Sequence, residues 1–161
     1  MNDPAAPPLT LEAMLRAMPK VELHCHLFGT VRHETFKQLN RRAGAPLADE
    51  EIEGFYTRGE KPVGVLRVLR ALDAQLVRNP GDLYQLTHEY LEDAAAHNVR
   101  HAEFFWNPTG TVHASGIAYA QAQDAIVRAI RDAQQASGIT GRLIAAIGRE
   151  ASPDAAVEMV E

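Results

Sequence analysis

The two histidines of the segment His24-Cys25-His26 are the residues whose type and spacing point most directly to chemistry. They stand in Lys20 to Leu27 (KVELHCHL), where apolar and polar residues alternate as in a β-strand. Side chains two positions apart on a strand project to the same face, with Cα atoms about 6.5 to 7 Å apart. Two imidazoles that lean together can then bind one tetrahedral zinc ion, each nitrogen lying about 2.1 Å from the metal. His24 and His26 are therefore candidate metal ligands.

An alternative interpretation is a strand whose polar face happens to carry histidines. The position of the pair favours the metal site, because it ends a strand immediately before Gly29 and parallel α/β proteins bind ligands at that end. Imidazole also binds copper, nickel and iron, so zinc is one choice among several divalent ions. A catalytic zinc site commonly has three or more protein ligands and a water, so further ligands must come from elsewhere.

Composition limits the partners of this chain. Its 161 residues include 16 Lys and Arg against 21 Asp and Glu, a net charge of -5, without a run of basic residues that would attract nucleic acid. We therefore expect no nucleic-acid partner. No apolar stretch approaches the roughly 18 residues that a membrane helix needs, and the opening MNDPAAPPL does not resemble a secretion signal. With Cys25 as its single cysteine, the protein is expected to be reduced and cytoplasmic.

Three strand candidates, near residues 20–27, 99–106 and 142–148, alternate with helical patterns. Helices are expected over 11–18, 33–42, from 49, over 65–76, 83–98, 117–137 and from 153 to 161, with a loop after residue 106. This order predicts an α/β fold with parallel strands joined by right-handed crossovers. The apolar stripe of the first helix, which contains Met14 and Met18, is expected to belong to the core. The sequence ends in a helix-like segment without a stop signal, so we expect residues 1–161 to be one partial domain.

Three segments resemble adenosine and adenine deaminases of the amidohydrolase superfamily. PKVELHCHLFGT (19–30) resembles their first barrel strand, VRHAEFFWNPTG (99–110) the second, and GRLIAAIGREASPDAA (141–156) the third. The order and spacing of the segments also agree, so the resemblance extends from about Leu11 to Glu161. It implies that this chain is the N-terminal part of a (β/α)8 barrel, which needs about 250 residues.

The resemblance also implies an activity. His24 and His26 match the family's first two ligands of one divalent ion, usually zinc, and the substrate is a small-molecule purine whose 6-amino group is hydrolysed to release ammonia. The third histidine, the aspartate, the acid and the base of that family would lie beyond residue 161, so no catalytic acid or base is expected within the segment. Two alternative functions stay open: an amidohydrolase that acts on another C–N or ester bond, and a non-catalytic truncated module. A homo-oligomer is a possible assembly.

Phe28 is the main departure from the family pattern. It occupies the place of a short polar or acidic residue that contacts the ribose in adenosine deaminases, and a phenyl ring cannot accept that hydrogen bond. We expect His26 and Phe28 to face the substrate, with packing under the loop as the alternative for Phe28. The segment HAEFFWNP is closer to the adenine deaminases, and the choice between adenine and adenosine stays open.

Overall fold

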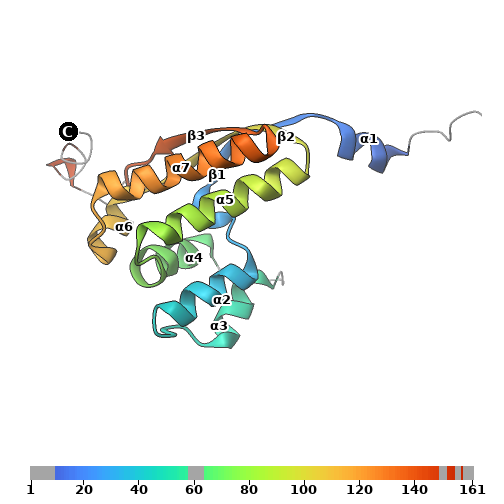
Figure 1. Ribbon diagram of the computed structural model, residues 1–161. Helices are drawn as coiled ribbons and strands as arrows, with labels where there is room; N and C mark the ends of the chain where they lie inside the picture. The colour runs from blue at the N-terminus through green and yellow to red at the C-terminus, as the bar shows by residue number, and fades with distance from the viewer. Residues whose placement is uncertain (1–9, 58–63, 149–151, 155–156, 158–161) are drawn as a thin grey trace, which may run out of the picture.

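A three-stranded parallel sheet in the order β1-β2-β3 organises the chain. The computed structural model describes residues 10–57, 64–148, 152–154 and 157. Its strands are β1 (Lys20–His26), β2 (Val99–Trp106) and β3 (Thr140–Ala145), and both strand pairs are parallel. Helices separate the strands along the sequence, and α5 (Pro80–Ala96) lies beside α7 (Tyr119–Ser137) against the sheet (Figure 1). The predicted α/β class with parallel strands is confirmed.

Local signals in the sequence explain where several helices begin and end. The Thr10 side chain accepts a hydrogen bond from the amide of Ala13 and so caps α1 (Leu11–Ala17). Asn79 and Asp82 form a reciprocal capping box at the start of α5. Gly138, with a φ of 75°, adopts the left-handed conformation that ends α7.

The region between β1 and α5 forms a helical layer beyond the sheet. It contains the short 3-10 turn η1 (Leu27–Gly29) and the helices α2 (His33–Arg42), α3 (Asp49–Tyr56) and α4 (Val65–Ala71). The helix expected over 65–76 does not stay α-helical to its end. Its last five residues form the π-helical segment η2 (Leu72–Leu76), whose final bond joins the Val77 amide to the Leu72 carbonyl.

Two further expectations about elements were wrong. Residues Pro108–Ser115 form helix α6 where a loop was predicted, because Asn107 caps the amide of Thr109 and Pro108 fits the first turn. The third strand occupies 140–145 instead of 142–148, because Thr140 already pairs with His101 in the sheet. The helix expected from 153 lies largely outside the described residues, of which Pro153, Asp154 and Val157 are helical.

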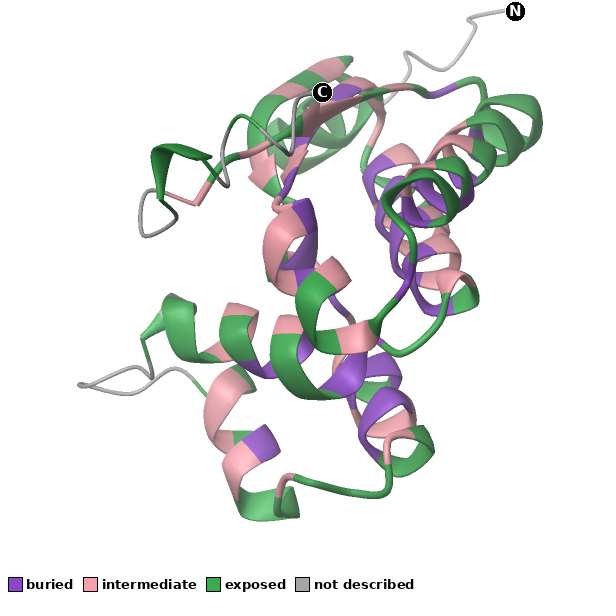
Figure 2. Ribbon diagram, turned by 90° about the vertical axis from the view of Figure 1, so that its left-hand side faces the viewer, coloured by how far each residue is buried: buried purple, intermediate pink, exposed green. Residues whose placement is uncertain are grey.

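The core lies between the sheet and its helices. Ala102, Phe104 and Trp106 of β2 are buried on the helix side, and Figure 2 shows buried residues on the inward sides of the helices. Helix α1 buries none of its residues, so the expectation that Met14 and Met18 belong to the core was wrong. The helix projects from the start of β1, away from the other helices (Figure 1).

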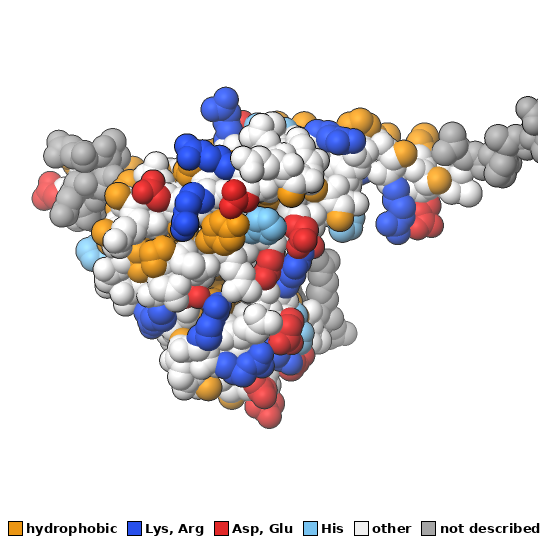
Figure 3. All heavy atoms as spheres, viewed as in Figure 1, with side chains coloured by type: hydrophobic (Ala, Val, Ile, Leu, Met, Phe, Trp, Pro, Cys, Tyr) orange, Lys and Arg blue, Asp and Glu red, His pale blue; other side chains and the backbone are white. Residues whose placement is uncertain are grey.

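Acidic and basic side chains are interspersed on the face of the described residues that Figure 3 shows. Several of them form ion pairs, such as that of Arg32 with Glu92 and Asp93. None of the described helices is both long enough and apolar enough to cross a membrane.

Candidate metal centre

A bulge in β1 decides which way its side chains face. Glu22 pairs with Ala102 and Cys25 pairs with Phe104, so two residues of β1, Leu23 and His24, stand opposite one residue of β2. Residues paired across parallel strands share a face of the sheet. Glu22 and Cys25 therefore lie on the helix side with Ala102 and Phe104.

His24 and His26 lie on the opposite face, which would line the interior of a barrel. His26 pairs with Phe105, and the ring of Phe105 lies against both imidazoles, with centroid distances of 4.7 Å to His24 and 5.5 Å to His26. The alternation of polar and apolar residues over Lys20 to Leu27 predicts that Glu22 shares the face of the histidines and that Cys25 points away from them. The first expectation was wrong, because strict alternation is broken between Glu22 and Cys25, and the second agrees with the observed register.

The two imidazoles have a separation that suits one metal ion. Their ring centroids lie 5.8 Å apart with an interplanar angle of 65°. Two imidazoles bound to one tetrahedral ion at about 2.1 Å from each nitrogen have centroids roughly 5 to 6 Å apart. Both side chains are exposed, and neutral imidazole nitrogen is a preferred zinc ligand. His24 and His26 therefore fit two positions of a zinc site.

Within the described residues, no group of three or more His, Cys, Asp and Glu side chains is close enough to hold a metal ion. The other polar groups on this face form their own contacts nearer the start of β2. The Nδ1 of His101 lies 2.7 Å from the Thr140 hydroxyl, and its Nε2 lies 3.4 Å from Glu103. A complete site therefore needs ligands beyond this described set.

Phe105 is the residue of the site to which the sequence analysis assigned no role. Its contact with both histidines packs the rings from the side of β2 and restricts their orientations. The sequence held one clue, because alternation places Phe105 on the same strand face as His101 and Glu103. In the structure Phe105 pairs with His26 across the two strands. Without the pairing of the strands, however, the contact could not be derived from the sequence.

Phe28 is a core residue of the turn that follows β1. Its side chain is 6% exposed and belongs to the main hydrophobic cluster, while the Thr30 hydroxyl closes the turn on the Leu27 carbonyl. This placement agrees with the alternative in which Phe28 packs under the loop. A contact of Phe28 or His26 with substrate stays a prediction.

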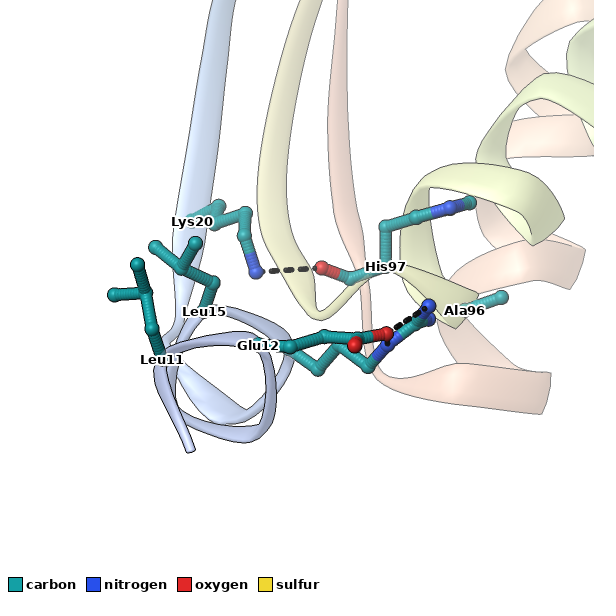
Figure 4. A pocket seen from close by; sticks show the side chains of 7 residues that line it. Leu11, Glu12, Leu15, Lys20, Ala96 and His97 are labelled. Carbon is teal, nitrogen blue, oxygen red and sulfur yellow. Dashed lines mark hydrogen bonds and ion pairs between the residues drawn. The ribbon is translucent and has the colours of Figure 1, made fainter. Parts of the chain in front are cut away.

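A groove of about 600 Å³ lies at the other end of the sheet, away from the histidines. Helix α1, Lys20 and the end of α5 line it, and the Lys20 ammonium donates to the carbonyl of His97 (Figure 4). The same ammonium also donates to the carbonyl of Met18. Glu12 and Arg16 in its wall pair with each other at 3.0 Å. The charged side chains that line the groove, Glu12, Arg16 and Lys20, thus all have partners among the described residues.

Cys25 is expected to react slowly with alkylating reagents. Burial and then the neighbouring Glu22 raise the pKa of its thiol, so little of the reactive thiolate is present at neutral pH. Mass spectrometry after iodoacetamide treatment at pH 7.5 should show several-fold slower labelling in the native protein than in denaturant. Equal rates in the two states would contradict this assignment.

Comparisons with known proteins agree with this geometry. Residues 19–161 match the family described as adenosine deaminase. The matched range contains both histidines and all three strands. The chain belongs to the adenosine deaminase family. The adenine deaminase of Chlorobium phaeobacteroides is 34% identical over 148 residues, which are 91% of this chain and 44% of that protein.

Two solved structures from this family and superfamily superpose on the chain. An amidohydrolase of Burkholderia ambifaria with bound Zn is 60% identical with a TM-score of 0.89, and the match covers 98% of this chain and 44% of that one. The adenine deaminase of Arthrobacter aurescens is 31% identical with a TM-score of 0.76, over 89% and 44% of the two chains. This member of the adenosine deaminase family thus spans less than half the length of each of these relatives.

Proposed function

We propose that these residues form the N-terminal part of a zinc-dependent hydrolase that deaminates a 6-aminopurine. The observation that carries the proposal is the pair of imidazoles at the end of β1, which face the same way at a separation suited to one ion. The bound Zn of the 60% identical amidohydrolase and the names of the adenine deaminase relatives support it.

In this proposal each residue of the site has a distinct task. His24 and His26 supply two neutral nitrogen ligands, and Phe105 holds their rings and keeps water from one side. Zinc held by these histidines would lower the pKa of a bound water toward about 7 and so make a nucleophile available at neutral pH. Hydrolysis of a 6-aminopurine by water would release ammonia and leave a 6-oxopurine. The acid and base that move the protons come from outside the described residues.

We further propose that the free base adenine is a better substrate than adenosine. Phe28 offers no acceptor for a ribose hydroxyl where the nucleoside deaminases carry an acid, and one lost hydrogen bond of this kind costs about 1 to 3 kcal/mol. That loss corresponds to roughly tenfold or more in kcat/KM. Steady-state ammonia release from adenine and from adenosine checks the preference, and a higher kcat/KM for adenosine would contradict it.

The test of the reaction uses the full-length protein that carries this chain together with the remaining barrel. Its intact mass under denaturing conditions comes first, since a complete barrel needs about twice the present chain. Zinc content and ammonia release are then measured before and after chelation, with non-purine amides and esters as alternative substrates. Activity confined to purines and lost with the metal supports the proposal, whereas full activity in the metal-free protein would refute it.

The remaining features that we propose concern the ligand and the compartment. The deaminase relatives support a small-molecule purine as the ligand. The single cysteine suits the reducing cytoplasm. A second copy of the chain as partner stays a prediction that measurement of the molecular mass in solution would check.

A further inference from the structure

Tyr90 of α5 binds β1 at the residue before the bulge. Its hydroxyl donates a hydrogen bond of 2.6 Å to the Glu22 carboxylate. The ring is 5% exposed and packs edge-on against Phe104, with a centroid distance of 5.4 Å and an interplanar angle of 79°. One side chain thus contacts the residue before the bulge and the neighbouring strand.

The position of Tyr90 matters because a bulged strand has more than one way to pair. A slip of one residue in register turns every side chain beyond it to the other face of a sheet. Such a slip in β1 would turn one or both histidines toward the helix layer. Contacts that hold Glu22 and Cys25 on the helix side leave only the opposite face for His24 and His26.

We propose that Tyr90 is a positioning residue for the metal site, whose hydroxyl holds the β1 bulge in the register that turns both histidines to one face. Tyr90 acts on the position of the imidazoles through its hydrogen bond to Glu22. The inference rests on the proposed zinc site at His24 and His26, and it assigns that site a support from α5, 68 positions away from Glu22 in the sequence.

A positioning role differs from a general contribution to folding. Metal ligands tolerate deviations of only about 0.2 Å in distance, so a small shift of the bulge affects metal binding strongly. Replacement of residues that orient metal ligands typically costs 10- to 100-fold in metal affinity. A purely structural role of Tyr90 would lower the melting temperature of the metal-free protein without a specific effect on zinc retention.

The test compares Tyr90→Phe with Tyr84→Phe in the full-length protein. Both tyrosines lie on α5, and the Tyr84 hydroxyl donates to Asp132 at 2.7 Å on the exposed side of the helices. The measurements are the rate of zinc transfer to an excess of chelator and the melting temperature of each metal-free protein. We expect Tyr90→Phe to lose zinc about tenfold faster or more than wild type, and Tyr84→Phe to match wild type.

A second variant shows whether Tyr90 acts through Glu22. Glu22→Leu removes the acceptor of the hydroxyl, and its combination with Tyr90→Phe is expected to release zinc no faster than the faster single variant, because both remove one interaction. Additive effects, or equal zinc retention by Tyr90→Phe and wild type, would overturn the inference. A wild-type protein that binds no zinc would instead refute the metal site and this inference together, so the two failures are distinguishable.

Discussion

Replacement of His24 or His26 by alanine is expected to remove zinc and deaminase activity together. Each imidazole supplies one of the two nitrogen ligands that β1 places side by side, and no described residue nearby completes a substitute set. Zinc lowers the barrier by several kcal/mol through the water that it activates, so we expect kcat/KM to fall about a thousandfold or more. Elemental analysis of the purified variants and ammonia release from adenine measure the two losses.

His88→Ala is the matched control for these variants. His88 lies on α5, where its ring stacks on Tyr84 at 5.8 Å, far along the chain from the strand that carries the candidate ligands. It is expected to keep both zinc and activity. A His24→Ala variant that retains stoichiometric zinc with wild-type activity would show that this histidine is not a ligand.

The strands and most helices were predictable because their signals are local. The alternation in β1, the cap at Thr10, the capping box at Asn79 and the glycine after α7 each lie within a few residues of the feature that they determine. Helix α6 was missed because its local signal is ambiguous. An Asn-Pro pair with a following Gly fits a loop as well as a helix start, so the cap at Asn107 is ambiguous in the sequence, and packing against η2 supports the helix.

The bulge in β1 could not be predicted, because its cause is not local. The letters KVELHCHL fit a regular strand, in which Glu22 and the histidines share a face. The partner that holds Glu22 on the other side is Tyr90, on a helix that packs against the sheet only in the folded chain. The placement of His24 and His26 on one face was nevertheless predicted correctly, since the irregularity begins after Glu22 and the two rings still lie 5.8 Å apart.

A half-buried carboxylic acid lies beside the end of β2. Asp73 of η2 accepts a hydrogen bond of 2.7 Å from the Thr111 hydroxyl, and Thr111 in turn accepts one of 3.1 Å from the indole of Trp106. A Cβ atom at Gly110 would lie 2.9 Å from the Asp73 carboxylate, so the first turn of α6 approaches it closely. Burial raises the pKa of Asp73 to about 6 from 3.8, while the bond from Thr111 opposes the rise.

This pKa has a defined consequence for stability. Between pH 3.8 and about 6 the folded protein holds a proton on Asp73 that the unfolded chain has released. The stabilising contribution of the protonated form is therefore complete below pH 3.8 and disappears as the pH rises through about 6. Its size is about 3 kcal/mol, from about 1.4 kcal/mol for each tenfold change in proton affinity.

Asp73→Asn is accordingly expected to become more stable relative to wild type as the pH rises. The amide has a similar shape, can still accept from Thr111 and carries no charge at any pH, so its free energy of unfolding should gain about 2 kcal/mol on that of wild type between pH 4 and pH 7. Denaturant unfolding of both proteins at a series of pH values measures this difference. Thr111→Val provides a second check, because loss of its hydrogen bond raises the pKa of Asp73 further and extends the decline in stability to higher pH. A difference between Asp73→Asn and wild type that stays constant from pH 4 to pH 7 would show that Asp73 is ionised in the folded protein throughout this range.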